Sequence, residues 1–347
     1  MKSYRLLSLV VIGALLLAAC SSATPTPTEA PTVPAAVEST ATIEPSPTLP
    51  PPTATSTPGS TSAPTLALPT TTPLPAATNT PAAVASIPPD KLVQKGHLTV
   101  CTDFPYPPQE FFDDNGDPQG LDIEIGTEIA NRLGLKIQFV NSVFDTIIAA
   151  VTSGKCDIII SAMNITTDRQ KQVSMIPYFQ AGQSFVAVKG NPQNINGWQD
   201  LCGKSAAAES GTTEADYLQG VNDYKGKGLT QMCTAKGLKP INVVVTQKDT
   251  DALQQLQAGK VVVYSTDSPV AAYYTVQHPD QFQVVGQPLE AISEGINMPC
   301  GVADCTKAPL TEVGTAVQSA LKSMMADGTY LKILTKWNLA SGAVTLP

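Results

Sequence analysis

Residues 144–163, "FDTIIAAVTSGKCDIIISAM", decide the fold, because they predict one helix followed directly by one buried strand. Apolar residues lie seven and four positions before the lysine of a Gly-Lys pair, and an apolar run follows that pair. Residues 249–268, "DTDALQQLQAGKVVVYSTDS", repeat the arrangement. The two stretches therefore predict one αβ unit in two copies, although two unrelated units with ordinary glycine stops would have the same pattern.

Strands and helices alternate on both sides of these stretches. In the first half, "HLTVCTD" (97–103) and "KIQFV" (136–140) predict strands around a helix at 121–134, and "CDIIIS" (156–161) predicts a third strand. The second half repeats the scheme with "KSAAAES" (204–210), "GTTEADYL" (211–218) and "INVVV" (241–245). Such alternation predicts an α/β fold with mostly parallel sheets. We expect Asp145 to cap the helix at 144–155.

The C-terminal residues 312–339 predict two helices that separate at Asp327 and Gly328. This segment contains no strand pattern of its own, so it must pack on a domain that is already formed. Ligands of open α/β sheets bind beyond the carboxyl ends of the strands. We therefore expect 101–106, 161–169, 209–214 and Asp267 to surround a shared cleft.

The first 20 residues have the layout of an export signal, with Lys2 and Arg5 ahead of an apolar core that is too short to span a membrane. The segment ends in "LAAC", which resembles the lipobox of bacterial lipoproteins and implies that Cys20 carries lipid. An ordinary signal cleaved at the small residues is the alternative. We expect a protein held by its lipid anchor on the outer face of the cell membrane.

Residues 21–88 consist almost entirely of Ser, Thr, Pro and Ala. A chain of this composition buries too little apolar surface to offset its ordering entropy, so we expect a disordered, extended linker. The folded part then begins near residue 89. The net charge of −8 argues against nucleic acid as a partner.

Export makes the other six cysteines candidates for disulfides. Cys300 and Cys305 flank a short turn, and Cys202 and Cys233 bracket one segment, so both pairs are disulfide candidates. Cys101 and Cys156 lie in predicted strands, where buried thiols are the alternative to a disulfide, and the sequence leaves their state open. The sequence has two isolated histidines and no CxxC motif, so we expect no metal site and no cofactor.

Residues 120–133, "GLDIEIGTEIANRL", resemble the signature of the family 3 extracellular solute-binding proteins, which are the amino-acid receptors of bacterial ABC importers. "TDFPYPP" before it, and "ITTDRQK", "ESGTTEADY" and "ADGTYLKILTKW" after it, also fall in the order and spacing of that family. The resemblance implies a periplasmic-binding-protein-like fold of type II, in which a two-strand hinge joins two αβ lobes. Lobe 1 would comprise 89–183 and 288–347, and lobe 2 would comprise 184–287.

The resemblance also implies how a free amino acid is held. Arg169 matches the arginine that binds the ligand's carboxylate, and a guanidinium can supply two parallel hydrogen bonds to that group. Thr212 and Thr213, at the start of a predicted helix, would assist. The alternatives are a solvated helix arginine and hydroxyl groups that only cap the helix.

Asp267 matches the aspartate that binds the ligand's ammonium. Ser161, Asn164 and the carbonyl of Ala162 would complete that part of the site, with Asn164 standing where many relatives have Ser or Thr. Tyr106 and Phe144 match aromatic residues that enclose the ligand's side chain, and plain core packing is the alternative.

Asp103 lies where relatives place an acid near the far end of the ligand's side chain, and Glu214 and Glu209 would lie close to it. Buried acids favour cationic ligands such as lysine, arginine or ornithine. Asp103 is also compatible with an uncharged polar ligand such as glutamine, and Glu209 alternatively is a solvated charge at the rim.

The resemblance implies binding without chemistry, in which a monomer closes over an amino acid and delivers it to the membrane permease of an ABC importer. A lyase on the same fold is a rival, but the sequence has no histidine near the expected cleft and no GxSxG motif. A protein that presents its ligand to a separate receptor is a further alternative.

Overall fold

The computed structural model describes residues 86–289 and 291–346. The predictions for the export signal, for lipid on Cys20 and for the linker up to residue 85 lie outside the described residues. Within the described part of the chain, no helix combines the length and the apolar character that crossing a bilayer requires.

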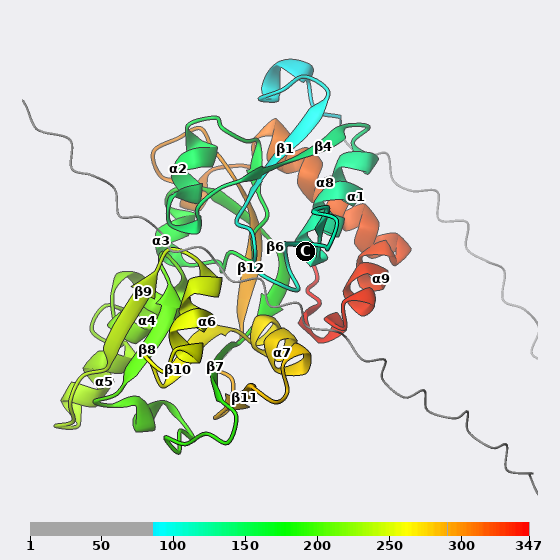
Figure 1. The fold of residues 1–347 in the computed structure, drawn as a ribbon. Coiled ribbons are helices and arrows are strands. Elements are labelled where there is room, and N and C mark those ends of the chain that lie inside the picture. The colour runs from blue at the N-terminus through cyan, green and yellow to red at the C-terminus, as the bar shows by residue number, and fades with distance from the viewer. Residues whose placement is uncertain (1–85, 290, 347) are drawn as a thin grey trace, which may run out of the picture. The chain divides into compact units, whose positions relative to one another are not determined.

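The first of two five-stranded sheets has the strand order β4-β1-β5-β12-β6 (Figure 1). Its strands are β1 (His97–Thr102), β4 (Lys136–Asn141), β5 (Ile158–Ile159), β6 (Ser174–Ala181) and β12 (Ile292–Met298). β1 pairs in parallel with β4 and β5, whereas β12 is antiparallel to β5 and β6. We call this sheet and the elements packed on it lobe 1, which also holds the short hairpin of β2 (Phe111–Phe112) and β3 (Pro118–Gln119).

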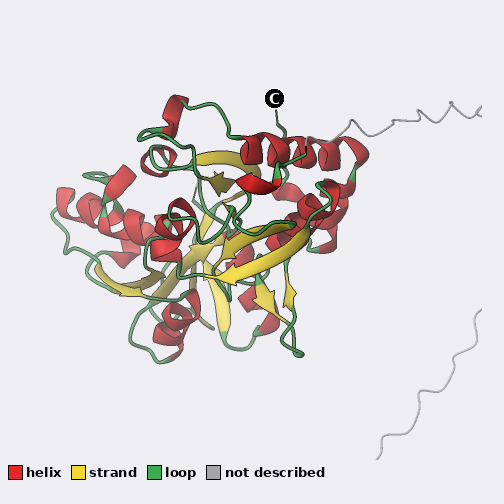
Figure 2. Cartoon of the chain, turned by 90° about the horizontal axis from the view of Figure 1, so that it is seen from above, coloured by secondary structure: helices red, strands yellow, loops and turns green. Residues whose placement is uncertain are grey.

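Helices cover both faces of the lobe 1 sheet (Figures 1 and 2). One face packs against α1 (Leu121–Arg132), α8 (Glu312–Asp327) and α9 (Thr329–Lys336), and the other packs against α2 (Ile147–Thr152). Arg132 joins α1 to the turn between α8 and α9 through an ion pair of 2.8 Å with Asp327. The prediction that the C-terminal helices pack on a lobe formed by earlier residues is therefore confirmed.

The predicted cap of the helix at 144–155 is wrong. Residues Phe144–Thr146 form a 3₁₀ turn, α2 begins at Ile147, and no side chain caps it. Asp145 instead lies against Gly211 of the other lobe.

The second sheet has the strand order β11-β7-β10-β8-β9, and we call it with its helices lobe 2. Its strands are β7 (Gln183–Val188), β8 (Ser205–Glu209), β9 (Asn242–Thr246), β10 (Val263–Asp267) and β11 (Phe282–Val285). Its helices are α4 (Thr213–Gln219), α5 (Leu229–Ala235), α6 (Asp249–Gln257) and α7 (Ser268–Gln277), and α3 (Thr167–Gln170) belongs to lobe 1.

The two lobes repeat one topology, as the matching sequence stretches predict. β1 lies between β4 and β5, and β8 lies between β9 and β10, with all four pairings parallel. The expectation of mostly parallel sheets is confirmed, because four of the five strands of each sheet run in the same direction. One strand next to a crossover runs against them in each lobe, namely β12 in lobe 1 and β7 in lobe 2.

The chain passes from lobe 1 to lobe 2 at Gly182, between β6 and β7, and returns between β11 and β12. The two crossovers lie side by side, because a Cβ on Gly182 would stand 2.6 Å from the carbonyl oxygen of Leu289. Only glycine permits so close an approach of two backbones. The exact lobe boundaries drawn from the sequence remain a prediction.

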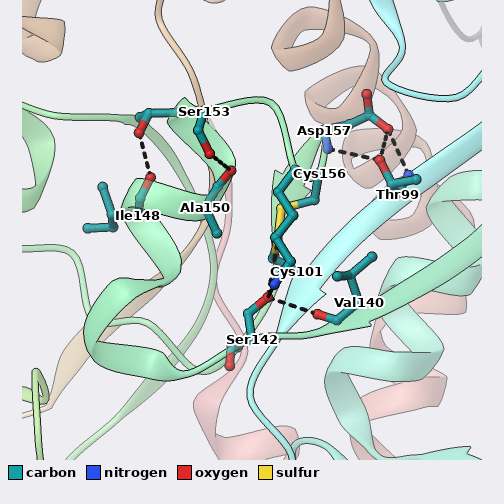
Figure 3. Close-up of a disulfide and its surroundings, with 12 residues drawn as sticks. Thr99, Cys101, Val140, Ser142, Ile148, Ala150, Ser153, Cys156 and Asp157 are labelled. Atoms are coloured by element: carbon teal, nitrogen blue, oxygen red, sulfur yellow. Dashed lines mark hydrogen bonds between the residues drawn. A yellow bond between two sulfur atoms is a disulfide. The ribbon is translucent and has the colours of Figure 1, made fainter.

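Three disulfides link the six cysteines of the described residues. Cys202–Cys233 and Cys300–Cys305 confirm the predicted pairs. Cys101 and Cys156, whose state the sequence leaves open, form a disulfide between β1 and the residues just before β5 (Figure 3). Figure 3 also shows that Asp157 accepts a hydrogen bond of 2.7 Å from the Thr99 amide, which fixes the same two segments beside the disulfide.

Candidate functional site

A pocket lies between the lobes at the carboxyl ends of β1, β5, β8 and β10. Its lining is polar and acidic: Asp103, Tyr106, Glu110, Phe144, Ser161, Ala162, Asn164, Glu209, Thr212, Thr213, Glu214 and Asp267. Every ligand-binding residue predicted from the sequence belongs to this lining except Arg169, whose guanidinium bonds to the carbonyl of the lining residue Asn164. The role of each residue toward a ligand remains a prediction.

The floor of the pocket is held by an acid of the α1 motif. Ala162 has a φ of 42°, in the left-handed region that residues with a Cβ rarely adopt. Its amide donates a hydrogen bond of 2.8 Å to Asp122, which also accepts one of 2.7 Å from the Tyr178 hydroxyl. Asp122 therefore fixes the backbone that turns from β5 into the pocket. Ser161 donates to Glu110 at 2.6 Å, so its proton is used within the protein.

Arg169 is a buried cation that joins the two lobes. Its Nη1 donates to the carbonyl of Asn164 and its Nη2 to the carbonyl of Gly211, each at 2.7 Å. Its guanidinium also lies over the ring of Phe144, 5.5 Å from the centroid. Burial lowers the pKa of Arg169, and the charges of Asp216, Glu214 and Asp267 oppose that change. An arginine has five N–H donors, so three remain beyond these two bonds.

The first turn of α4 brings lobe 2 to the pocket. The Thr212 hydroxyl accepts a hydrogen bond of 3.2 Å from the Ala215 amide and donates to the Glu209 carbonyl at 2.8 Å, so it caps the helix as the alternative interpretation holds. The Thr213 hydroxyl instead reaches across to the side-chain oxygen of Asn164. The side-chain nitrogen of Asn164, Nδ2, is buried and has no hydrogen-bond partner.

Asp267 ends β10 and meets Tyr106 of lobe 1. The Tyr106 hydroxyl donates to Asp267 Oδ2 at 2.9 Å, while Asp267 Oδ1 is buried without a partner. Burial raises the pKa of Asp267 well above its ordinary value, and the charges of Glu214 and Glu294 add to the rise. Glu214 lies next to it with one unpartnered oxygen, and burial raises its pKa also.

The side of the pocket at Asp103 contains a cation that the sequence analysis did not single out. Asp103 Oδ2 accepts the Phe144 amide at 2.7 Å, and Oδ1 forms an ion pair with Lys248 of lobe 2. Glu209 lies beside this pair, and burial, followed by the charges of Asp249 and Asp103, raises its pKa to about 10. Lys248 lies two residues after the end of β9, so its place near the carboxyl end of a parallel strand was an available signal.

Two further acids were also missed. Glu110 and Glu294 are both fully buried, and each keeps one carboxyl oxygen without a hydrogen-bond partner. Gln109 and Tyr178 donate to Glu294 at 2.9 and 3.3 Å. Burial and then the charge of Asp122 raise the pKa values of Glu110 and Glu294 well above the ordinary range. Glu110 lies in a loop, and Glu294 lies in β12 close to a crossover. Neither position belongs to a periodic pattern in the sequence.

The fold agrees with the family comparison. The family model for bacterial extracellular solute-binding proteins, family 3, matches residues 98–340. The chain therefore belongs to this family, and its structural neighbours are type II periplasmic amino-acid-binding proteins.

Relatives of this class carry names that refer to two kinds of amino acid. The chain is 25% identical to the arginine-binding protein ArgT of Corynebacterium glutamicum, over 75% of this chain and 80% of that protein. It is 28% identical to the L-cystine-binding protein TcyA of Bacillus subtilis, over 70% of this chain and 82% of that protein.

Two solved structures of ancestral arginine-binding proteins, one bound to arginine and one bound to glutamine, are 34% and 35% identical, each with a TM-score of 0.60. They match 70% and 71% of this chain, and 98% and 99% of their own chains.

Proposed function

We propose that this protein is the substrate-binding component of an ABC importer and binds a free amino acid, with a cationic side chain, between its two lobes. It delivers that ligand to a membrane permease and catalyses no reaction. The names of its relatives, which are binding proteins for arginine and cystine, support the class of ligand. The export signal and the "LAAC" sequence support tethering to the outer face of the membrane through lipid on Cys20.

One observation carries the proposal: a buried arginine and buried carboxyl groups without complete partners adjoin one pocket. Arg169 retains three N–H donors beyond its two bonds to carbonyls. Asp267 and Glu214 each retain a buried oxygen without a partner. A zwitterion supplies both missing partners, because its carboxylate matches the guanidinium and its ammonium matches the acids.

The ligand would favour the closed arrangement of the lobes because it touches both. Arg169 reaches from lobe 1 to the Gly211 carbonyl of lobe 2, and Tyr106 reaches from lobe 1 to Asp267. A ligand stabilises one conformation by its differential affinity for that conformation. An amino acid held by Arg169 and Asp267 would therefore strengthen closure.

The acids around the pocket support a cationic side chain. Five carboxyl groups belong to the lining, from Asp103, Glu110, Glu209, Glu214 and Asp267. Buried carboxylates gain most from a buried cation with hydrogen-bond donors.

A thermal-unfolding screen of the purified protein against all common amino acids, ornithine and citrulline tests the proposal. At about a hundred times its dissociation constant, a ligand adds ~2.7 kcal/mol to the free energy of unfolding. We expect the largest shifts with arginine, lysine or ornithine, confirmed by calorimetric titration. The absence of any shift across the panel would contradict the proposal, and shifts with neutral amino acids alone would contradict the cationic preference.

A further inference from the structure

We propose that Lys248 determines the charge preference of the side-chain end of the pocket, because its ammonium competes with a cationic ligand side chain for Asp103. The inference rests on the proposed function and names a specificity residue within it. With Lys248 against Asp103 the pocket suits a neutral side chain, and with Lys248 displaced it suits a cationic one.

The contact joins the two lobes. Lys248 stands at the start of α6 in lobe 2, whereas Asp103 and Phe104 follow β1 in lobe 1. The ammonium pairs with Asp103 Oδ1 and also donates to the Phe104 carbonyl at 3.1 Å. The Phe144 amide lies on Oδ2 and the Lys248 ammonium on Oδ1, so a cationic ligand side chain that reaches this carboxylate meets the like charge of Lys248, which disfavours both cations together.

The two partners differ in their access to water. The side chain of Lys248 is 27% exposed, whereas that of Asp103 is 6% exposed. An ammonium on a flexible four-carbon stem is strongly hydrated, so Lys248 can turn toward solvent and recover hydration there. Asp103 cannot do so, and in the closed protein it needs a cation from one source or the other.

The neighbouring acid, Glu209, does not offer a second carboxylate to a cation at neutral pH. Burial, with the charges of Asp249 and Asp103, raises the pKa of Glu209 to about 10, so this carboxyl group is protonated. Burial raises the pKa of Asp103 and the contact with Lys248 opposes that rise, while its two oxygens accept the Phe144 amide and the Lys248 ammonium. One carboxylate therefore faces one cation, which is either Lys248 or the side chain of the ligand.

Arginine and citrulline provide the test, because they share shape and differ in side-chain charge. We would measure both dissociation constants by calorimetry on the purified full-length protein, on Lys248→Met and on Lys260→Met. Lys260 is an exposed lysine of the same lobe and serves as the matched control. Lys248→Met should raise the ratio of the citrulline constant to the arginine constant at least tenfold, and Lys260→Met should change it less than twofold.

A double-mutant cycle separates competition at Asp103 from a general effect of the substitution. In an Asp103→Asn background, Lys248→Met should change the ratio less than twofold, because the carboxylate for which the cations compete is gone. Lys248→Gln, which keeps a polar head group, provides a second variant if the methionine variant is unstable.

The experiment distinguishes a failure of the inference about Lys248 from a failure of the proposed function. If the wild-type protein binds arginine or citrulline and the ratio stays within twofold in both Lys248 variants, the inference about Lys248 is wrong while the proposed function stands. If the wild-type protein binds neither compound nor any other amino acid of the panel, the proposed function itself is wrong.

Discussion

Replacement of Arg169 by alanine should weaken binding of the amino-acid ligand more than any other single change in the pocket. Arg169 is 8% exposed, and its guanidinium donates to two carbonyl groups, one in each lobe. In the proposed complex its remaining donors hold the ligand's carboxylate. Alanine would leave that carboxylate buried without a cation.

The size of the effect follows from the burial of the pair. Removing one partner of a buried ion pair costs about 3–5 kcal/mol, because the other charge remains uncompensated. At ~1.4 kcal/mol for each tenfold change in affinity, the dissociation constant should rise about a hundredfold to several thousandfold. Arg169→Lys keeps the charge and loses the planar pair of donors, so its constant should lie between those of the wild type and the alanine variant.

Calorimetric titration with the best ligand of the screen measures these constants, and Arg132→Ala provides the matched control. Arg132 forms ion pairs of 2.8 Å with both Glu128 and Asp327, and none of these three residues belongs to the pocket lining. Its loss should lower the midpoint of thermal unfolding and change affinity less than twofold. An affinity within tenfold of the wild type in folded Arg169→Ala would refute the assignment of the carboxylate to this guanidinium.

Two further predictions concern closure and pH. Gly211→Ala should weaken ligand binding at least tenfold, because the new Cβ would stand 2.8 Å from the Cα of Asp145 in the other lobe. Gly259→Ala is the control, because Gly259 has a similar positive φ but open space around its Cβ position. Equal losses of affinity in both variants would contradict the prediction. Burial raises the pKa of Asp249 to about 7, so the folded state binds the extra proton between about pH 4 and 7, and stability falls as pH rises through that window. The free energy of unfolding of the ligand-free wild type, measured with urea, should therefore fall between pH 5 and 8 by roughly 1–3 kcal/mol more than that of Asp249→Asn. Equal decreases in both proteins would contradict the raised pKa of Asp249.

The repeated αβ unit was predictable because it rests on local patterns. Apolar residues at helical spacing, a Gly-Lys stop and an apolar run fix α2 with β5 and α6 with β10. The carboxyl ends of those strands then place Asn164 and Asp267 at one pocket, as the topology rule for open sheets implies.

The contacts that were missed depend on how distant segments meet. Cys101 and Cys156 are both strand-associated cysteines, and only the strand order places β1 next to β5 so that they can pair. Lys248 reads locally as the start of a helix. Its partner Asp103 lies 145 positions earlier and in the other lobe, so the ion pair follows from the packing of one lobe on the other, which no local pattern encodes.

The acid-rich pocket links folding to binding. A buried carboxyl group without full hydrogen bonding destabilises the fold, and Glu110, Glu214, Asp267 and Glu294 each retain an unpartnered oxygen. Apolar residues of similar volume would make a more stable core, since replacing buried ionic groups in this way is often stabilising. Under the proposed function, the ligand accounts for the unpartnered oxygens of the lining acids Glu110, Glu214 and Asp267. A ligand that brings positive charge to them should stabilise the closed protein, and Lys248 supplies part of that charge at Asp103 from within the chain.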